Sequence, residues 1–374
     1  MELIEPPSRP ILALNAGSSS LKFGFYSVDR QSVKALLSGM AEGTAGGGYR
    51  NFQLADAGDK PLHVETEAET KESPVDRIVV LLKRHGLPMP EAVGHRIVHG
   101  GPGCRRHALI DAGVMLQLEA ATAFAPLHLP PALTLLRMAR ECFTSLPHVA
   151  CLDTAFHVDM PLLARVLPIP RKFREKGIER YGFHGLSCES IVRQLGDAVP
   201  ARLIIAHLGH GASVTAVAHG RSVDTSMGLT PAGGMMMSTR CGDIDPGVLV
   251  HLLREFGYDA AGVDTMIHRE SGMLGVSGIS GDMRELRRAA PRDPEARLAI
   301  AMFCQSVRKH IAAMASVLGG VDLLVFTGGI GENDAEARAS ICEDMAGMGI
   351  NSIITLPADE AQTIAWHAHG LTTN

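Results

Sequence analysis

The stretch ILALNAGSSSLKFGFY, residues 11–26, predicts the architecture at the start of the chain. Two apolar runs, Ile11–Leu14 and Leu21–Tyr26, flank a turn of small residues, a pattern typical of a β-hairpin. Glycine in such a turn lets backbone N–H groups approach an anion closely, because it has no Cβ. The sequence therefore predicts a hairpin whose turn offers hydrogen-bond donors.

A second stretch of the same kind, RLIIAHLGHGASVTAV, occupies residues 202–217. It again has strand, small-residue turn and strand, and it lies about 190 residues after the first, which indicates an internal duplication. Between and around the two hairpins, the sequence predicts helices before His85, over 112–123 and over 130–142, and a loop over 38–48. Strands that alternate with helices predict an α/β protein.

The last third of the chain predicts one long helix and one buried strand. Ile300, Phe303, Val307 and Ile311 recur at spacings of three and four, so an amphipathic helix is expected over residues 295–318. A strand over 322–327 follows and ends in Gly-Gly-Ile-Gly. Asn333, with a glutamate three residues on, resembles the N-cap of a further helix.

Composition excludes several functional classes. The chain has 374 residues, of which 46% are hydrophobic, and its 40 acidic against 35 basic residues give a net charge of −5. No basic field is expected to attract nucleic acid, and no apolar run reaches the roughly 18 residues of a membrane span. The acidic start lacks the apolar segment of a secretory signal. Seven scattered cysteines without a CxxC favour reduced thiols and a cytoplasmic location.

Well-known catalytic motifs are absent: the sequence has no GxxxxGK[ST], no GxGxxG after a strand, no HExxH and no GxSxG. His207 and His210 need not converge, so a histidine metal site is disfavoured. What stands out is three glycine-rich turns after apolar strands, near Asn15, near Gly209 and near Gly328. One such turn alone is typical of an ordinary tight turn, whereas three favour a bound nucleotide.

Two arginines lie in glycine-rich surroundings. Arg96 belongs to GHRIVHGG, and Arg240 lies beside Asp243 and Asp245 in MSTRCGDIDPG. A pair of guanidinium groups can clamp a planar anion such as a carboxylate or a phosphate.

These segments together resemble the acetate kinase family of the acetate and sugar kinase, Hsp70 and actin superfamily. The segments that carry the resemblance are, in chain order, LNAGSSSLKF, GHRIVHGG, APLHLPP, DTAFH, RYGFHGLS, IIAHLGHGAS, VDTSMGLTP, MSTRCGDIDPG and FTGGIGEN. They extend over residues 11–367, nearly the whole chain. The resemblance implies an α/β, duplicated actin-like (ribonuclease H-like) two-domain fold with an interdomain active-site cleft. It implies one domain of residues 1–150 plus 357–374, and a second of residues 151–356 that carries most nucleotide contacts.

The resemblance also implies an activity: reversible in-line phosphoryl transfer from ATP to acetate, which gives ADP and acetyl phosphate. The expected cofactor is Mg²⁺, with Mn²⁺ as a substitute, and the expected assembly is a homodimer without nucleic-acid or membrane partners. The alternatives are propionate or butyrate kinase and, in another class, a non-catalytic ATP-binding member of the superfamily. Arg96, His184 and Arg240 argue against the last, because a pure ATP sensor has no need of all three.

Residue roles follow from the resemblance by motif position. The implied catalytic residues are Asp153, His184, Arg240, Arg96 and His128. The implied substrate-binding residues are Arg96, Val98, Leu127, Phe183 and Pro231, the last four forming a small apolar site around the acyl methyl group. The implied nucleotide-binding residues are Asn15, Ser18, Ser20, Lys22, His207, Gly209, His210, Gly211, Gly328, Gly329, Gly331 and Asn333. The implied Mg²⁺ residues are Asn15, Asp153 and Glu360.

The sequence departs from the family pattern at several positions. HLGNG is HLGHG here, so His210 replaces an asparagine that meets nucleotide phosphate, and HNPP is HLPP, with Leu129. Ser238 and Cys241 also differ from the family pattern, and the segment between Asn333 and Pro357 is short. We expect these departures to change the affinity for the phosphoryl donor and the catalytic efficiency, not the reaction class.

Overall fold

The computed structural model describes residues 8–17, 20–43, 49–58, 60–64, 73–343 and 345–373. The chain divides into two compact units. The first unit comprises Met1–Ala155 and Asp359–Asn374, and the second comprises Phe156–Ala358.

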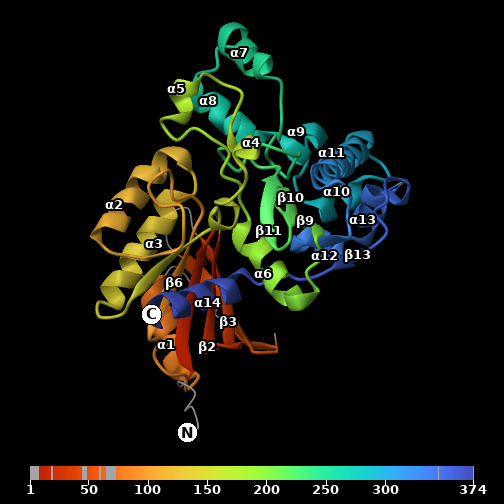
Figure 1. The fold of residues 1–374 in the computed structure, drawn as a ribbon. Coiled ribbons are helices and arrows are strands. Elements are labelled where there is room, and N and C mark those ends of the chain that lie inside the picture. Colours follow the sequence, from red (N-terminus) through yellow and green to blue (C-terminus); the bar gives the residue numbers. More distant parts are fainter. Residues whose placement is uncertain are drawn as a thin grey trace. The chain divides into compact units, whose positions relative to one another are not determined.

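The first unit is built on one mixed sheet, whose strands are coloured from red to yellow in Figure 1. Over the described residues its strands are β1 (Arg9–Ala16), β2 (Ser20–Val28), β3 (Val33–Gly43), β4 (Tyr49–Asp56), β5 (Pro61–Val64), β6 (Ala92–Ile97), β7 (Ala108–Leu109) and β8 (His148–Leu152). They are ordered β5-β4-β3-β2-β1-β6-β8-β7. The β1–β2 pair is the predicted hairpin, β3 continues it antiparallel, and β6 and β8 run parallel to β1.

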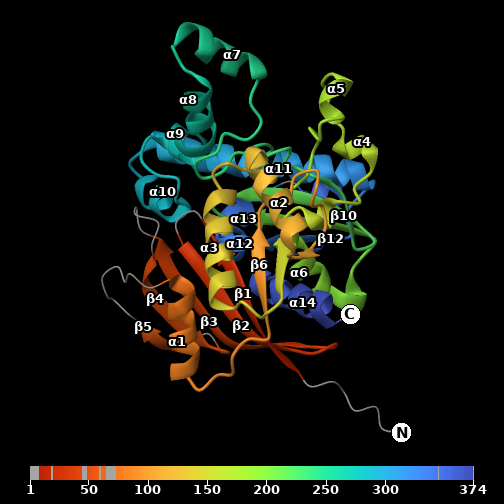
Figure 2. The ribbon, with the colours of Figure 1, turned by 90° about the vertical axis from the view of Figure 1, so that its left-hand side faces the viewer.

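Helices cover both faces of the first sheet (Figure 2). They are α1 (Pro74–Arg84), α2 (Ala112–Ala120), α3 (Leu129–Cys142) and α14 (Glu360–Thr373). Leu12 and Leu14 of β1 share a core with α1 and α3. On the opposite face α14 lies so close to β6 that a Cβ on Gly94 would come within 2.5 Å of Ile364 Cγ2. Glycine at residue 94 therefore allows α14 to pack directly on the sheet.

The second unit repeats this plan with five strands among its described residues. The strands are β9 (Arg202–Leu208), β10 (Ala212–Ala218), β11 (Arg221–Thr225), β12 (Leu323–Thr327) and β13 (Ile353–Thr355), ordered β11-β10-β9-β12-β13. The β9–β10 and β10–β11 pairs are antiparallel, and β12 and β13 run parallel to β9. The first unit has the same five-strand pattern in β3-β2-β1-β6-β8. The predicted duplication is confirmed by this shared topology.

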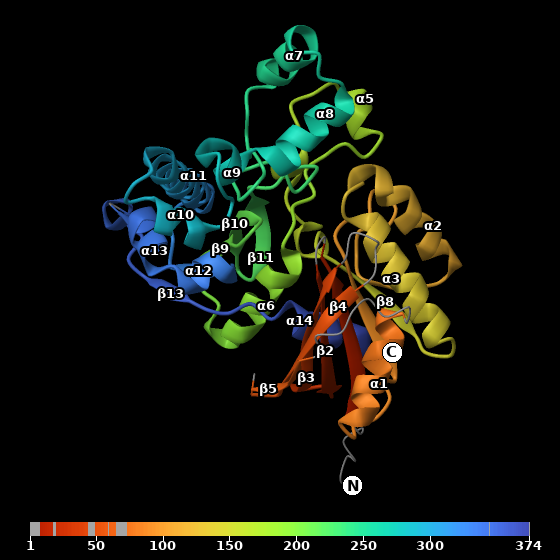
Figure 3. The ribbon, with the colours of Figure 1, turned by 180° about the vertical axis from the view of Figure 1, so that it is seen from behind.

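The helices of the second unit include the long one that the sequence predicts (Figure 3). They are α4 (Leu162–Arg165), α5 (Arg171–Arg174), α6 (Gly185–Leu195), α7 (Pro246–Glu255), α8 (Ala260–Thr265), α9 (Gly272–Ser277), α10 (Met283–Ala289), α11 (Pro294–Leu318), α12 (Gly328–Asn333) and α13 (Ala335–Cys342). The N-cap of α11, Asp293, accepts hydrogen bonds from two backbone N–H groups, and Gly319 ends the helix at φ +67°. Phe303, Val307 and Ile311 are fully buried, as the periodicity predicts. Among all the described helices, none is both long enough and apolar enough to cross a membrane.

Two local predictions are wrong. Residues 38–43 are not a loop but the end of β3, paired with β2 and β4, while residues 44–48 lie outside the described residues. The small residue at Gly39 is needed because the Phe23 ring lies against it, 2.3 Å from where a Cβ would be. The N-cap of α13 is Asp334 rather than Asn333, which is the last residue of α12.

Candidate active site

Four polar side chains meet at one edge of the first sheet. Asn15 is near the end of β1, Arg96 is in β6, and Asp153 follows β8 directly. Because these three strands are parallel, their carboxyl ends lie at the same edge. Glu360, the first residue of α14, completes the group. We call these four residues the charged cluster.

Direct hydrogen bonds connect the charged cluster. Arg96 donates to both carboxylate oxygens of Asp153, with Nε–Oδ1 at 3.1 Å and Nη2–Oδ2 at 2.5 Å. Its Nη1 also donates to Asn15 Oδ1 at 3.1 Å. Asn15 Nδ2 donates in turn to Glu360 Oε2 at 3.1 Å, and Arg96 Nε lies 3.8 Å from the same oxygen. One guanidinium is thus fixed between two carboxylates.

Burial sets the electrostatics of the charged cluster. The Asp153 side chain is only 1% exposed, and those of Arg96 and Glu360 are 18% and 19% exposed. Burial raises the pKa of the Asp153 carboxyl, although the Arg96 guanidinium opposes the rise. Burial alone would lower the pKa of Arg96, but the charges of Asp153 and Glu360 more than offset it and raise that pKa. The cluster has the hard oxygen donors that Mg²⁺ prefers, so its chemistry fits the predicted metal.

The structure places the other predicted residues of the first unit as follows. Lys22 is exposed on β2 and is the cross-strand partner of Asn15. Ser20 begins β2, and its carbonyl oxygen accepts from Gly17 N at 2.7 Å. Ser18 lies outside the described residues. His128 is the N-cap residue of α3; Val98 is buried, and Leu127 is half-buried.

The second sheet also gathers predicted residues at one edge. His207 lies near the end of β9, Gly209 and Gly211 form the β9–β10 turn, and Ser213 lies near the start of β10. The turn is tight, since Gly209 N donates to Gly211 O at 2.9 Å. Gly328 follows β12, the parallel neighbour of β9. Its φ of +80° and its contact with the Leu208 carbonyl, 2.8 Å from a Cβ built there, both require glycine.

A pair of histidines lies at this edge and is held by serines. His184 Nδ1 is 3.0 Å from Ser213 Oγ, and His207 Nδ1 is 2.8 Å from Ser187 Oγ. The two imidazole rings have their centroids 4.2 Å apart. A Cβ built on Gly211 would lie 3.2 Å from His184 Nε2 and 3.1 Å from Arg240 Nη1. The structure therefore brings His184 and Arg240 to the same glycine.

Arg240 is carried by a glycine-rich loop that α9 supports. The guanidinium donates to the Pro231 carbonyl oxygen at 3.2 Å, so a predicted catalytic residue and a predicted acyl-site residue of the second unit are in contact. Met273 N donates to Met237 O at 2.8 Å, and Leu274 N donates to Ser238 O at 2.9 Å. Phe183, the remaining predicted acyl-site residue of this unit, is 1% exposed.

A cavity of about 750 Å³ in the second unit contains several predicted nucleotide-binding residues. Gly209, His210, Gly329 and Asn333 line it, together with Ser238. The sequence did not predict a further wall, which consists of Asp282, Met283, Arg284 and Arg287. The only sequence signal for this wall is Asp282, whose carboxylate caps α10. The volume is within the range of small-molecule sites.

The N-terminus of α12, at this edge of the second sheet, is already hydrogen-bonded to a carboxylate. Glu332 Oε1 accepts from Gly328 N at 2.8 Å and from Thr327 Oγ1 at 3.2 Å. The first N–H of α12 thus binds the chain's own anion. Gly329 is different: no atom lies within 4 Å of a Cβ built on it, and it faces the cavity.

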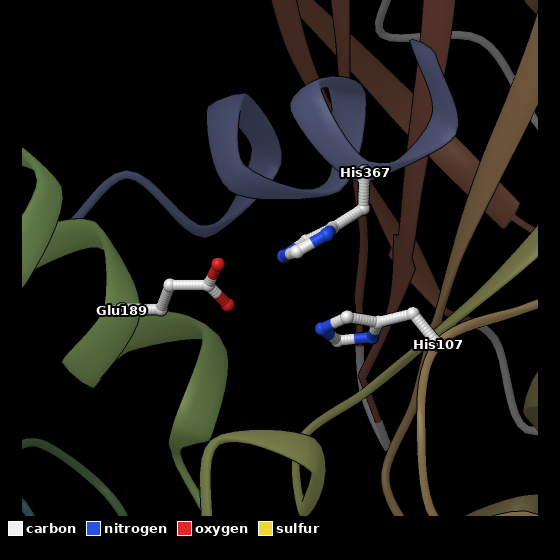
Figure 4. Close-up of side chains that lie close together, drawn as sticks. All are labelled: His107, Glu189 and His367. Atoms are coloured by element: carbon white, nitrogen blue, oxygen red, sulfur yellow. The ribbon is translucent and has the colours of Figure 1, made fainter. Parts of the chain in front are cut away.

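A second pair of imidazoles, which the sequence did not predict, belongs to the first unit. His107 and His367, drawn in Figure 4, have ring centroids 3.8 Å apart. His107 Nδ1 accepts from Leu152 N at 2.9 Å, directly before Asp153. His107 therefore helps to hold the end of β8, from which Asp153 projects.

A model of the acetokinase family matches residues 10–362 of the chain. The chain belongs to the acetokinase family. It is 41% identical to an acetate kinase of Rhodopseudomonas palustris over 351 residues, which cover 91% of this chain and 87% of that one. It is 43% identical to acetate kinase 2 of Neisseria meningitidis over 350 residues, with the same coverage.

Solved structures agree with this family. A propionate kinase from Francisella tularensis superposes with a TM-score of 0.88 at 34% identity, covering 97% of this chain and all of that one. An acetate kinase from Porphyromonas gingivalis gives 0.85 at 32% identity, covering 98% and 100%. The predicted α/β, actin-like two-domain fold is confirmed by these similarities and by the duplicated sheet.

Proposed function

We propose that this protein is an acetate kinase that reversibly transfers the terminal phosphoryl group of ATP to acetate, giving acetyl phosphate and ADP. Membership of the acetokinase family and its relatives named acetate kinase support the reaction. The observation that carries the proposal is the charged cluster. A guanidinium fixed between the buried carboxylate of Asp153 and the half-buried one of Glu360 suits a reaction in which two anions, a carboxylate and a triphosphate, must meet.

The chemistry needs charge and positioning more than proton transfer. Acetate is already ionised at pH 7, so its oxygen can attack without a general base. Phosphoryl transfer depends on in-line placement and on stabilisation of charge on the transferring group. We infer that Arg96 binds the acetate carboxylate, and that Arg240 and His184 donate to the phosphoryl oxygens. His128 is proposed as a further donor.

We infer that Mg²⁺ accompanies the nucleotide and that Asn15, Asp153 and Glu360 hold it, with Mn²⁺ as a substitute. Their amide and carboxylate oxygens are suitable ligands for either ion. The metal would supply positive charge to the triphosphate when bound. Arg96 already bonds both oxygens of Asp153, so the same carboxylate serves the arginine and the metal site.

We assign the nucleotide to the cavity beside Gly209 and Gly329. Its glycine walls admit a flat base and a sugar, and Asn333 offers an amide to polar atoms of the nucleoside. The implied phosphate residues are Asn15, Ser18, Ser20 and Lys22 of the first hairpin and His207, His210 and Gly211 of the second. Gly328 and Gly331 belong to the same short helix, α12, as Gly329. We place most nucleotide contacts in the second unit, as the sequence predicts.

The acyl site is proposed to take short chains. Val98, Leu127, Phe183 and Pro231 would surround the methyl group. One methylene in an apolar site changes selectivity by only about 10- to 200-fold. Propionate is the second candidate substrate, favoured by the similarity to a propionate kinase at a TM-score of 0.88.

An acyl-hydroxamate assay with ATP and Mg²⁺ tests the function. Formate, acetate, propionate and butyrate are compared at equal concentrations. We expect acetate and propionate to give hydroxamate and butyrate to give little. Preference for butyrate in kcat/KM would refute the acyl assignment, and ATP binding without any hydroxamate would leave a non-catalytic nucleotide-binding protein.

We also propose a cytoplasmic homodimer without nucleic-acid or membrane partners. Exposed apolar side chains support dimerisation. They lie on, or directly after, helices of the second unit in which no residue is buried. α4, α5 and α7 are of this kind. Leu163 of α4 is 96% exposed, and Phe256, which directly follows α7, is 65% exposed. Light scattering of the wild type and of Phe256→Asp tests this: the wild type should have twice the monomer mass, and the variant should dissociate.

A further inference from the structure

The motif DTAFH ends in His157, a residue that has no part in the proposed mechanism. His157 is 1% exposed, yet both of its ring nitrogens have partners. Nε2 lies 3.0 Å from the Phe183 carbonyl oxygen, and Nδ1 lies 2.8 Å from Ser222 Oγ. Because a carbonyl oxygen only accepts, Nε2 carries the proton and the neutral ring accepts the Ser222 hydroxyl at Nδ1. The hydrogen bonds thus select one tautomer.

The segment that His157 contacts has an unusual backbone. Gly182 has φ +74°, and a Cβ there would lie 2.7 Å from His157 Cδ2 and 2.6 Å from Thr225 Cγ2. His184 has φ +58° and ψ +26°, a left-handed conformation that costs free energy for a residue with a side chain. Such a conformation persists only where neighbouring groups hold it.

Besides the bond from the His184 ring to Ser213, three of the hydrogen bonds that hold this segment involve the backbone just before His184. Tyr181 N and Gly182 N both donate to the Gly228 carbonyl oxygen, at 3.0 and 3.3 Å. The third bond is the one from His157 to the Phe183 carbonyl, immediately before His184. It is made by a side chain, and it fixes the peptide unit that joins Phe183 to His184.

We propose that His157 is a positioning residue for the proposed phosphoryl transfer, which holds His184 in its left-handed conformation and Phe183 in the acyl site. It touches neither substrate; it acts through the Phe183 carbonyl. The kinetic consequence of this inference rests on the proposed function. Its structural consequence, the conformation of His184, does not.

Burial supports this role, because it lowers the pKa of His157 to about 4. The ring therefore stays neutral from about pH 5 upward and keeps the same donor and acceptor throughout the working range. A cationic ring would have to donate at both nitrogens.

The test compares three variants with the wild type. His157→Leu removes the donor, and His157→Gln replaces it with an amide N–H of similar reach. His148→Leu is the matched control: His148 is also buried, and its Nε2 lies 3.2 Å from a phenylalanine carbonyl, that of Phe143, in the first unit. For each protein we would measure kcat per folded molecule, KM for ATP, the acetate-to-propionate ratio and the NMR resonances of the His184 ring.

His157→Leu should lose about 10²-fold in kcat with KM for ATP within about threefold, because misplacement of a catalytic group affects the transition state most. Its acyl ratio should change and the His184 resonances should shift. His157→Gln should recover about tenfold of the loss, and His148→Leu should keep its kcat per folded molecule. If His157→Leu does not fold, His157→Gln and Ser222→Ala carry the comparison.

Two results overturn the proposal: unchanged His184 resonances in a folded His157 variant, or a kcat loss that His148→Leu reproduces. A wild type without hydroxamate formation would refute the acetate kinase assignment instead. In that case the His184 resonances still decide whether His157 holds this segment.

Discussion

The two sheets share a strand order but present different chemistry at corresponding edges. The edge of the first sheet carries Arg96, Asp153 and Glu360, with Lys22 nearby on β2. The corresponding edge of the second sheet has glycines and two imidazoles held by serines, beside a cavity of about 750 Å³. One scaffold thus supports an ion-paired cluster at the edge in one unit and a cavity lined partly by glycines at the edge in the other.

This difference indicates a division of roles. A half-buried guanidinium fixed by carboxylates is preorganised to bind and orient small anions, and the carboxylates can hold a metal ion. Glycine turns beside a cavity give space and backbone N–H groups to a larger ligand. We therefore expect the second unit to determine nucleotide affinity, whereas turnover should depend on Arg96 of the first unit and on Arg240 and His184 of the second.

The largest effect is expected from removal of the arginines. Arg96→Ala and Arg240→Ala should each lower turnover by about 10²–10³-fold, because each contacts charge that develops during transfer. The two variants should differ in their free energy of unfolding. Arg96→Ala leaves Asp153 buried without its hydrogen-bonded partner, at a cost of about 3–5 kcal/mol for a buried pair.

Arg240→Ala removes contacts with the Pro231 carbonyl and a methionine sulfur, so a smaller loss of stability is expected. Steady-state kinetics and urea unfolding of both variants measure the two effects. Turnover near that of the wild type in either variant, with unchanged circular dichroism, would contradict the proposed clamp.

A smaller effect is expected from Gly211→Ala. The added methyl group would lie 3.1–3.2 Å from Arg240 Nη1 and His184 Nε2, so both donors must move. We expect kcat to fall by about 10- to 100-fold, since small displacements of catalytic groups are costly. Gly370→Ala, where a Cβ meets no atom within 4 Å, is the control and should keep full activity. Equal activity of the two variants would show that this edge tolerates displacement.

The smallest effect concerns His210, which lines the nucleotide cavity. Burial and the charge of Arg240 lower the pKa of His210, while Asp282 raises it. A bound triphosphate should raise this pKa, so binding takes up a proton and ATP should bind several-fold more tightly as pH falls from about 8 towards 6 and below. Calorimetry at fixed free Mg²⁺ should show a flatter dependence for His210→Asn. Identical slopes would mean that His210 does not meet the phosphates.

Much of this fold could be predicted from local pattern. The two hairpins and α11 follow from alternation and from the spacing of Phe303, Val307 and Ile311, because each pattern lies within one element. The end of β3 could not be predicted, since the glycine at residue 39 is explained by Phe23 on another strand.

Prediction of the site was limited in the same way. The motif residues Asn15, Arg96, Asp153 and Glu360 were identified, and the structure joins them by hydrogen bonds. The cavity wall of Asp282 and Arg284 was missed, because only the fold brings α10 to Gly209. His157 was missed as well, since its role depends on the backbone conformation of His184.

The division of roles is tested most directly by the affinity for ADP, measured by calorimetry for the wild type, Arg96→Ala and Gly329→Leu. The leucine side chain can enter the cavity without a backbone clash, because a Cβ on Gly329 meets no atom within 4 Å. We predict that Gly329→Leu weakens ADP binding by about tenfold or more, whereas Arg96→Ala binds ADP within about threefold of the wild type although its turnover is lost. Weak ADP binding by Arg96→Ala together with unchanged binding by Gly329→Leu would contradict this division of roles.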